Sequence, residues 1–419
     1  MQGVYLHRLF SDGVALKRSR KLRTLIAVAI LGFVASCTQQ QSSESVPEDV
    51  EEISIDPTDI PEKADISEWI KEVRLIPLQE SDGLYIGQAN ELVLHNGHYV
   101  VLDRHVSKQA AVFDTLGNPV ASFGKIGRGP GELVQLVDMW LTNANNIELY
   151  DNYLTRILTY GQDYQLIGER SFENRAMFQA VETIPGADGY IGFAGRSVYN
   201  QPYDGQSYRL AFLNDSLEIT GTELQYDPKL NGALIMTPDN PFAKVNDTLL
   251  FFEHYTNAIF QVKPNGQLAE RYRLSYGADA LPADFETRLI EPNLALFTAQ
   301  EMNMSKMRDV FKGYAGFQGR WLESAGYALF DSFDEGQNHF TTLYGKDRKE
   351  VLGQGRMLVE SDRYHIILPS FMATQVTGNR FIALFDGLRL QHAISKDSPL
   401  YPLIDDHPEK DFILEVVFN

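Results

Sequence analysis

The feature that most constrains the fold is a short, mostly apolar motif that recurs six times along the chain. The copies end at Asp103, Asp151, Ala194, Glu253, Asp331 and Asp386. Successive copies are 48, 43, 59, 78 and 55 residues apart. A period of roughly 40–60 residues with several short strands per unit is typical of β-propeller blades. The repeat therefore predicts one large all-β domain, although the length alone would suggest two or more domains.

Turn residues separate the predicted strands within a unit. Leu116-Gly117-Asn118 and Pro264-Asn265-Gly266 each lie between two apolar segments. Asparagine and glycine accept the positive φ angles of tight hairpin turns. Each unit is therefore predicted to contain, in order, a strand, an acidic turn, a second strand, a Gly/Asn turn and a third strand.

A glycine-rich segment, Ser122–Glu132, joins two predicted strands because glycine and proline disfavour the middle of a strand or helix. Its Phe-Gly and Gly-Arg-Gly-Pro-Gly-Glu sequences resemble a loop between blades in the Bacteroidetes six-bladed β-propeller lipoproteins, relatives of NHL-repeat propellers. The segment 151–160 is also similar to the NHL pattern, with an Asp followed five residues later by an Arg. The resemblance implies a six-bladed propeller over residues 69–419.

A helical insertion is predicted at about 281–312, in the long gap between the fourth and fifth motif copies. Leu281–Lys312 lacks strand alternation and carries apolar residues among charges, which indicates one or two amphipathic helices broken at Pro292. Its methionines suit an adaptable binding surface. The interpretation we favour is that they form the buried face of a helix packed on the propeller.

Both ends of the predicted propeller carry an apolar strand pattern. Val73–Pro77 lies near the start, and Phe412–Phe418 lies at the end. A ring of blades removes its exposed strand edges only if the two ends pair. We therefore expect both strands to share the last blade.

Residues 1–36 have the features of an export signal: basic residues, an apolar run from Leu25 to Ala35, and then Val34-Ala35-Ser36-Cys37. The run is too short to span a bilayer. The last four residues match a bacterial lipobox, which implies cleavage before Cys37 and lipid attachment to its sulfur. The alternative is a buried thiol behind an uncleaved apolar segment. Cys37 is the only cysteine, so no disulfide is expected.

Residues 37–68 are predicted to be an acidic, flexible tether. Thr38–Lys63 holds eight acidic residues, one basic residue and no aromatic residue, too little apolar surface to drive ordering. The whole chain has a net charge of −19. Such a charge repels nucleic acid and anionic lipid. We expect no nucleic-acid partner, and membrane contact only through the N-terminal lipid.

The predicted ligand-binding surface is the mouth of the central channel. In four-stranded antiparallel blades, the links between blades and the turns between second and third strands emerge on one face. Arginine with aromatic neighbours suits carboxylates, sugars and planar rings. The candidate residues are His105, Arg128, Glu132, Tyr153, Arg196, His254, Tyr255 and Arg320. The structural alternative is that Asp151 and Arg156 pin adjacent blades together, and that Arg128 and Glu132 shape their own loop.

Motifs for metal or nucleophile chemistry are not found. The nine histidines are scattered, and the glycine loop lacks the Lys-Ser/Thr pair of a phosphate-binding loop. We therefore expect no metal, no cofactor and no identifiable catalytic residue. Short Asp-Ser/Thr-Leu segments resemble O-glycan acceptors of exported Bacteroidetes proteins at Thr115, Ser216 and Thr248, although each also fits an ordinary turn.

Three functions remain open at this point. The first is a monomeric, lipid-anchored binding or scaffolding module of the cell envelope, held at the outer membrane, which contacts a small molecule, glycan or protein through its channel mouth. The second is a hydrolase or lyase that acts on glycan or peptide on the same scaffold. The third is a structural subunit of an envelope complex. Two carboxylates, or a histidine and an acid, converging in the channel would favour the enzyme.

Overall fold

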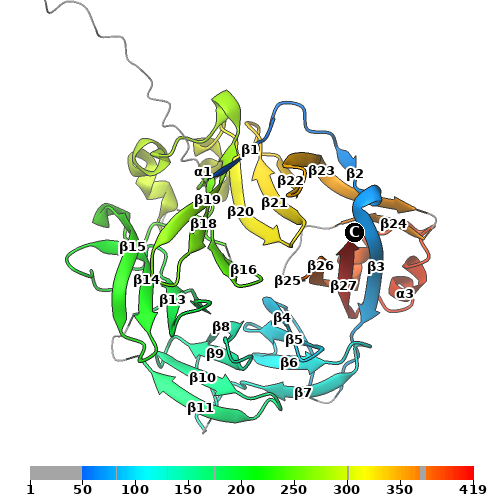
Figure 1. Cartoon of the computed structure of the whole chain (residues 1–419), viewed down its shortest axis with the longest axis horizontal. Helices are drawn as coiled ribbons and strands as arrows, with labels where there is room; N and C mark the ends of the chain where they lie inside the picture. The colour runs from blue at the N-terminus through cyan, green and yellow to red at the C-terminus, as the bar shows by residue number, and fades with distance from the viewer. Residues whose placement is uncertain are drawn as a thin grey trace, which may run out of the picture. The chain divides into compact units, whose positions relative to one another are not determined.

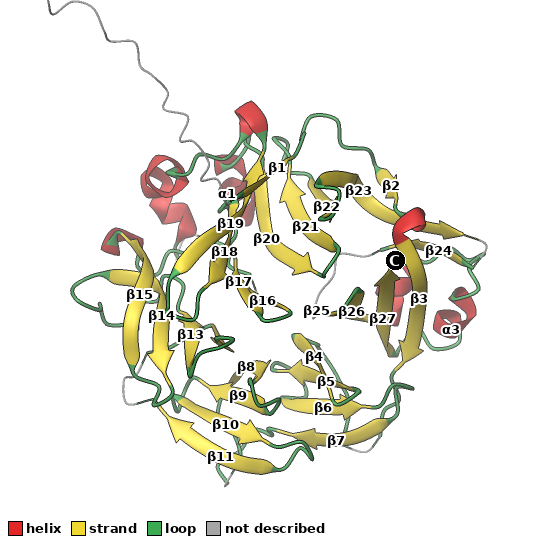
Figure 2. Ribbon diagram, in the orientation of Figure 1, coloured by secondary structure: helices red, strands yellow, loops and turns green. Residues whose placement is uncertain are grey.

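The structure is a computed structural model that describes residues 50–81, 83–129, 131–172, 176–238, 240–299, 302–361, 363–368 and 374–419. Within residues 50–419, six sheets stand around a central axis like blades (Figure 1). Short helical segments lie outside the ring of strands (Figure 2). The all-β, six-bladed propeller predicted from the repeat is confirmed.

Each blade is an antiparallel sheet whose strands follow one another from the channel outward. Blades one to three are β4 (Glu91–His95), β5 (His98–Asp103), β6 (Gln109–Phe113) and β7 (Pro119–Phe123); β8 (Leu136–Leu141), β9 (Ile147–Asp151), β10 (Arg156–Tyr160) and β11 (Leu166–Ser171); and β12 (Ala180–Thr183), β13 (Gly189–Phe193), β14 (Ser207–Asn214) and β15 (Ile219–Tyr226). All six copies of the sequence motif lie in, or directly after, the second strand of a blade.

Blades four and five carry additional strands, and blade six takes its outermost strand from the start of the domain. Blade four is β16 (Phe242–Val245), β17 (Thr248–Phe251), β18 (Ala258–Val262) and β19 (Leu268–Ser275); blade five is β20 (Gly316–Glu323), β21 (Tyr327–Phe333), β22 (His339–Gly345) and β23 (Glu350–Ser361), with β24 (Tyr364–Ile367) beside β23; blade six is β25 (Thr374–Thr377), β26 (Arg380–Asp386), β27 (Asp411–Phe418) and β3 (Ile70–Pro77). The helices α2 (Gly387–Ala393) and α3 (Tyr401–Asp405) lie between β26 and β27.

The hydrophobic core lies between neighbouring blades. One cluster joins Val100 and Leu102 of blade one to Leu149 and Leu158 of blade two, and all four side chains are fully buried. Tight turns reverse the chain between strands: Asn96 and Gly97 connect β4 to β5 with φ angles of 51° and 77°. These positive angles are those of a hairpin turn of the type that Asn-Gly favours. Gly117 and Gly266, in the two turns predicted from the sequence, also have positive φ angles, of 82° and 77°.

The two ends of the propeller close the ring, as predicted. Strand β27 is the third strand of blade six, and the early strand β3 pairs with it antiparallel, from Phe412 opposite Pro77 to Phe418 opposite Ile70. The edge that β27 would otherwise expose is therefore covered by a strand from the start of the domain. This closure ties residues more than 330 positions apart in one sheet.

The prediction of a flexible tether over residues 37–68 is wrong for its second half. Strand β1 (Glu51–Ser54) pairs parallel with β19, and β2 (Lys63–Asp65) pairs parallel with β23. Ile53, Ile55 and Ile66 are buried. The acidic composition of the segment concealed these spaced isoleucines, which supply the apolar contacts that ordering requires. The residues from Thr38 to Asp49 lie outside the described residues.

The insertion between blades four and five is helical, as predicted. It contains η4 (Glu286–Ile290), η5 (Glu291–Phe297), which has Pro292 in its first turn, and α1 (Met304–Val310). Ile290, Phe297 and Met307 are buried in a cluster with residues of blades four and five. The preferred interpretation of a buried helical face is therefore confirmed, although Met302 and Met304 remain about half exposed.

Candidate functional site

Two of the motif aspartates fasten the loops of the predicted mouth face. Asp103, at the end of β5, accepts hydrogen bonds from five backbone amides at 2.8–3.1 Å: those of Gly87 and Gln88, and three in the turn that follows it. Asp151 does the same at the end of β9 with four amides. Each carboxylate ties the segment that enters a blade to a turn of that blade. The sequence suggested that Asp151 pins adjacent blades together, whereas these bonds join an entry segment and a turn of the same blade.

The corresponding acids of blades four and five form ion pairs with arginines. Glu253, which follows β17, lies 3.2 Å from Nη1 of Arg209. Asp331 in β21 pairs with Arg320 of β20 and accepts a hydrogen bond of 2.8 Å from the Thr341 hydroxyl. The motif acid is thus used for loop fastening in blades one and two and for charged contacts in blades four and five.

The central channel holds a cavity of about 550 Å³. All six blades contribute residues from their innermost strands to its wall. The segment between blades three and four adds Met236, Thr237, Pro238 and Asn240. This volume lies in the range of small-molecule sites. Of the eight sequence candidates, His254 and Arg320 lie in the wall of this cavity.

A β-bulge in blade five presents three consecutive residues to the cavity. The pairing of β20 with β21 shifts register between Phe317 and Trp321, and Gln318, Gly319 and Arg320 all line the cavity wall. Bulges re-aim side chains, and they are over-represented near functional sites. Burial lowers the pKa of Arg320 to about 10, so it stays charged at neutral pH and balances Asp331.

His254 lies directly against this bulge. Gly319 has a φ of +78°, and a Cβ built on it would lie 2.6 Å from the His254 ring. Only glycine therefore leaves room for the imidazole in this position. Burial, aided by the charges of Arg320 and His339, lowers the pKa of His254 to about 4, which makes the ring neutral at physiological pH. Its buried Nδ1 has no hydrogen-bond partner among the described residues.

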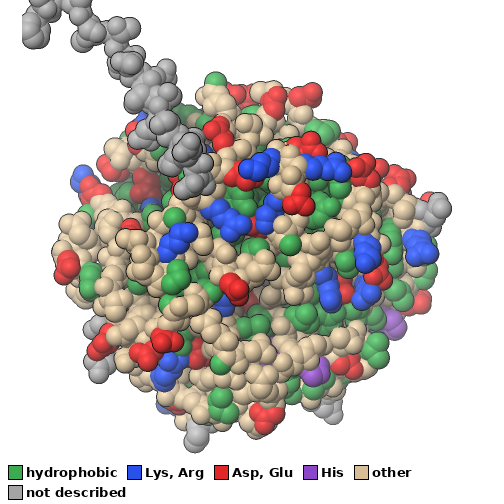
Figure 3. All heavy atoms as spheres, in the orientation of Figure 1, with side chains coloured by type: hydrophobic (Ala, Val, Ile, Leu, Met, Phe, Trp, Pro, Cys, Tyr) green, Lys and Arg blue, Asp and Glu red, His purple; other side chains and the backbone are tan. Residues whose placement is uncertain are grey.

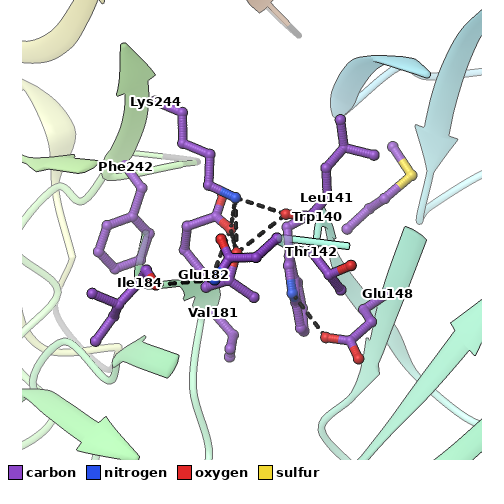
Figure 4. Close-up of polar contacts among 12 residues, drawn as sticks. Trp140, Leu141, Thr142, Glu148, Val181, Glu182, Ile184, Phe242 and Lys244 are labelled. Carbon is purple, nitrogen blue, oxygen red and sulfur yellow. Dashed lines mark hydrogen bonds and ion pairs between the residues drawn. The ribbon is translucent and has the colours of Figure 1, made fainter. Parts of the chain in front are cut away.

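A second charged group lies in the channel wall between blades two, three and four (Figure 4). The Lys244 ammonium is 2.6 Å from Glu182 Oε1, 2.7 Å from the Leu141 carbonyl oxygen and 2.9 Å from Thr183 Oγ1. Burial raises the pKa of Glu182, while the lysine acts in the opposite direction. All three protons of the Lys244 ammonium therefore have acceptors, and the contacts of this lysine join blade four to blades two and three.

Two carboxylates meet in the wall between blades one and two. Glu91 and Asp138 are buried and hydrogen-bonded to each other, and burial raises the pKa of Asp138 to about 6 and that of Glu91 well above its usual range. Glu91 also accepts the Met139 amide at 2.8 Å, and Asp138 accepts the Val181 amide. Arg104 lies 3.5 Å from Glu91 and lowers the pKa of both carboxyl groups, against the effect of burial. The pair joins the innermost strands of three blades, a structural use of converging carboxylates.

The other sequence candidates lie away from the cavity. His105, Arg128 and Tyr153 are exposed in loops and turns and do not line it. Glu132 accepts a hydrogen bond of 2.6 Å from the Gly129 amide, so this side chain holds its own glycine loop. The geometry gives these four residues no part in the cavity site.

Arg196 and Tyr255 were predicted to lie at the open mouth of the channel, but both are buried against the helical insertion. Arg196 is buried and pairs with Glu286 of η4. The Tyr255 ring stacks on Phe311, with 4.3 Å between centroids and 12° between planes. The insertion, whose packing the sequence did not reveal, covers both side chains.

Sequence analysis missed most of the cavity wall. Lys244, Glu182, Gln318, His339 and the two tryptophans Trp140 and Trp321 all line it. Charged or polar residues in the first strand of a blade, where the pattern is otherwise apolar, were the available signal. In the part of the chain that the structure describes, no three His, Cys, Asp or Glu side chains are grouped to hold a metal ion. The same residues contain no helix long and apolar enough to cross a membrane.

The modification sites predicted from the sequence fall into two groups. Thr115 and Ser216 are exposed in turns between third and fourth strands, and Thr248 is half-buried at the start of β17. By the alternation of antiparallel strands, all three lie on the face opposite the channel mouth. Their glycosylation remains a prediction. Cys37 lies outside the described residues.

Comparisons with solved structures support the fold. A protein of Bacteroides fragilis NCTC 9343 whose name assigns it to export has a TM-score of 0.66 at 15% identity, over 88% of this chain and 99% of that chain. A DUF4221 family member from Bacteroides vulgatus reaches 0.48 at 10% identity, over 84% and 97%. Virginiamycin B lyase from Staphylococcus aureus reaches 0.38 at 10%, over 83% and 99%. The first likeness shows a shared fold; the other two are too distant to bear on function.

Comparison with curated proteins gives no match. The evidence for membership of a family comes instead from a sequence model that spans nearly all of the propeller. Residues 50–404 match the family described as "Domain of unknown function (DUF4934)", and the chain belongs to this family.

Proposed function

We propose that this protein is a binding module of the cell envelope that holds a polar small molecule in its central channel. The observation that carries the proposal is His254, a neutral imidazole with a buried and unpartnered Nδ1, held in the cavity wall by a glycine that no other residue could replace without moving the ring. A buried polar atom without a partner costs free energy. His254 lines the cavity, and a ligand that turns its ring so that Nδ1 becomes accessible would hydrogen-bond to this atom and recover that cost.

The charges of the wall favour a ligand without strong net charge. Arg320 is balanced by Asp331, Lys244 by Glu182, and His254 is neutral. The indole N–H groups of Trp140 and Trp321 already donate to Glu148 and Glu323 at 3.1 and 2.9 Å, which leaves their rings as apolar wall. Hydrogen bonds and ring contacts would therefore dominate recognition. Sugars, amino acids and short peptides have this character.

Gly319→Ala is expected to weaken binding by about tenfold or more, because the new methyl group must displace the His254 ring. The measurement is a ligand-observed NMR screen with monosaccharides, amino acids and dipeptides, followed by titration of the hits. His254→Ala should lose the same hits. Arg128→Ala is the matched control, because this arginine is exposed in a loop that does not line the cavity. Unchanged affinity in both cavity variants would contradict the proposal.

An enzyme is the second candidate, and His254 is again the reason. A buried, neutral imidazole beside an arginine–aspartate pair is in the protonation state that a general base requires, and a glycan or peptide hydrolase or lyase could use it. His254→Gln separates the two functions. A binder should retain part of its affinity in this variant, whereas an enzyme should bind substrate and fail to turn it over. A role as a structural subunit of an envelope complex would predict neither effect.

We further propose that the chain is anchored in the envelope, at the outer membrane, through a lipid on Cys37. The basic and apolar succession before Val34-Ala35-Ser36-Cys37 supports this location, as does the shared fold with a protein assigned to export. Cys37→Ala is expected to abolish incorporation of labelled fatty acid and to release the protein from membrane fractions. Ser36→Ala, which leaves the cysteine in place, should remain anchored. Fatty-acid labelling of the Cys37→Ala protein would refute the assignment.

A further inference from the structure

Loops on the mouth face of blades one and two carry exposed apolar side chains. Tyr153, in the turn between β9 and β10, is 68% exposed, and Val106, in the turn between β5 and β6, is 53% exposed. Leu154 in the first of these turns is exposed as well, as are Tyr85 and Ile126 in the segments that enter blades one and two. These five side chains do not line the channel cavity. They are therefore a feature separate from the site described above.

Asp103 fastens the part of this region that belongs to blade one. Its carboxylate accepts hydrogen bonds of 2.8 Å from the amides of Val106 and of Gly87, which lies two residues after Tyr85. A Cβ built on Gly87 would lie 2.2 Å from Val106 Cγ1, so the valine side chain packs directly on this segment. The turn that carries Val106 and the segment that carries Tyr85 are thus joined.

Asp151 fastens the part that belongs to blade two. Its Oδ1 accepts the amides of Tyr153 and Leu154 at 3.2 and 3.1 Å, and its Oδ2 accepts the Val134 amide at 2.8 Å. The residue before Val134 pairs with Ile126. Because these bonds already fix the loops in the free protein, a partner that contacts them need not order them, which lowers the entropic cost of binding.

Two lysines lie beside the apolar side chains. Ala110 lies opposite Phe123 in the pairing of β6 with β7, and continuing this register by two residues places Lys108 opposite Lys125 at the mouth end of the strands. Both lysines are exposed, and neither has an ion-pair partner among the residues that the structure describes. Two adjacent cations repel each other, so a carboxylate between them is favourable. We call the five apolar side chains and these two lysines the blade one–two surface.

We propose that the blade one–two surface docks a segment of another protein that combines apolar side chains with carboxylates. Exposed apolar patches on soluble proteins mark interaction sites, and tyrosine is enriched among the residues that dominate interface energetics. The lysine pair provides the complementary charge, which steers association and fixes the register of the partner.

The charge of the whole protein favours a short protein segment over an anionic membrane. Interactions between exposed charges are largely screened beyond about 8 Å at physiological salt. A short segment therefore senses mainly Lys108 and Lys125, whereas a planar membrane also faces the rest of a chain whose net charge is −19. This proposal does not rest on the function proposed for the channel.

The test is a selection of phage-displayed random dodecapeptides on the full-length protein, followed by titration of the enriched peptides by fluorescence anisotropy. We expect enriched sequences that contain both acidic and apolar residues. Tyr153→Ser is expected to weaken their binding by about tenfold or more. The double substitution Lys108→Glu with Lys125→Glu should weaken it similarly and reduce its salt dependence. Leu116→Ser is the matched control, because this leucine is 73% exposed in a turn on the opposite face.

The melting temperature separates binding from folding. The Tyr153 side chain is exposed and its bond to Asp151 comes from the backbone, so Tyr153→Ser should melt like the wild type. If it does not, the double lysine variant alone decides.

Several results would overturn the proposal. The first is enrichment of no acidic and apolar peptides, and the second is unchanged affinity of the enriched peptides in the well-folded variants. Loss of their binding only in Gly319→Ala would assign these peptides to the channel cavity. Binding to phosphatidylglycerol vesicles that the double lysine variant loses, without peptide binding, would make the surface a membrane contact. A dimer in sedimentation velocity that Tyr153→Ser dissociates would make the occupant a second copy of this chain.

Discussion

Deletion of Phe412–Asn419 is expected to abolish the cooperative unfolding transition of the whole propeller. The deletion removes β27, which pairs with β26 on one side and β3 on the other. Five of the six apolar side chains lost are buried: Phe412, Ile413, Leu414, Val416 and Phe418. At about 1.5–3 kcal/mol each, their burial contributes on the order of 10 kcal/mol, comparable to the net stability of a whole domain.

Substitutions within β27 provide the control for this deletion. Leu414→Ala, at a fully buried position, should lower the free energy of unfolding by about 2–5 kcal/mol, and Val417→Ala, at a partly exposed position of the same strand, by less than about 1 kcal/mol. Circular dichroism during thermal and urea denaturation measures all three proteins. A truncated protein with an unchanged melting temperature would show that β27 does not close the ring.

Asp103→Ala should be the most destabilising single substitution among the loop-fastening residues, at about 3–5 kcal/mol. The carboxylate accepts five backbone amides, and its loss leaves them without an acceptor. Asp114 is the matched control in the same blade: it accepts two backbone amides in an exposed turn, where water can replace it. Asp114→Ala should therefore cost about 1 kcal/mol or less.

The pH dependence provides an independent check on Asp103. Burial alone would raise the pKa of this carboxyl group, but the backbone amide bonds outweigh burial and lower the pKa to about 2. Because the folded pKa is below the unfolded value, the stabilisation is complete above about pH 4 and is lost as the pH falls toward 2. The difference in stability between wild type and Asp103→Ala should therefore shrink in acid. A difference that is constant from neutral pH to acid would contradict this role.

The fold could be predicted from the sequence because every propeller blade repeats the same pattern of buried strands and connecting loops. The second strand of each blade is buried on both faces and ends at a loop, which is why Val101-Leu102-Asp103 and its five relatives stand out in the sequence. Closure also followed from physics, since an unpaired edge at either end is unfavourable. The sequence analysis did not predict that β1 is an ordered strand, because it judged the whole segment by its acidic composition. Ile53 and Ile55 within that segment are buried.

The functional site was harder to predict from the sequence, because its wall is assembled from the innermost strands of all six blades. His254 and Arg320 were found through the rule that places certain turns on one face. Arg196 obeys the same rule, yet it is covered by Glu286 of an insertion whose packing the sequence does not specify. Lys244 and Glu182 are charged residues in first strands, but this signal identifies a channel wall only once the strand order within each blade is known.

Charges of both signs lie on the face drawn in Figure 3, and the absence of a nucleic-acid partner stays a prediction from the net charge. Acidic and basic side chains are interspersed over the face drawn in Figure 3, without the continuous basic stripe that binds a phosphate backbone. The net charge of −19 acts in the same direction. Selectivity is thus expected to come from local contacts rather than from the field of the whole protein.

The most direct test of the central claim is a crystal structure of the protein with the tightest small molecule from the NMR screen. We expect the ligand in the channel cavity, with the His254 ring turned so that a polar atom of the ligand lies within hydrogen-bond distance of Nδ1. A ligand bound instead on the exposed methionines of the insertion, with His254 Nδ1 untouched, would contradict the account.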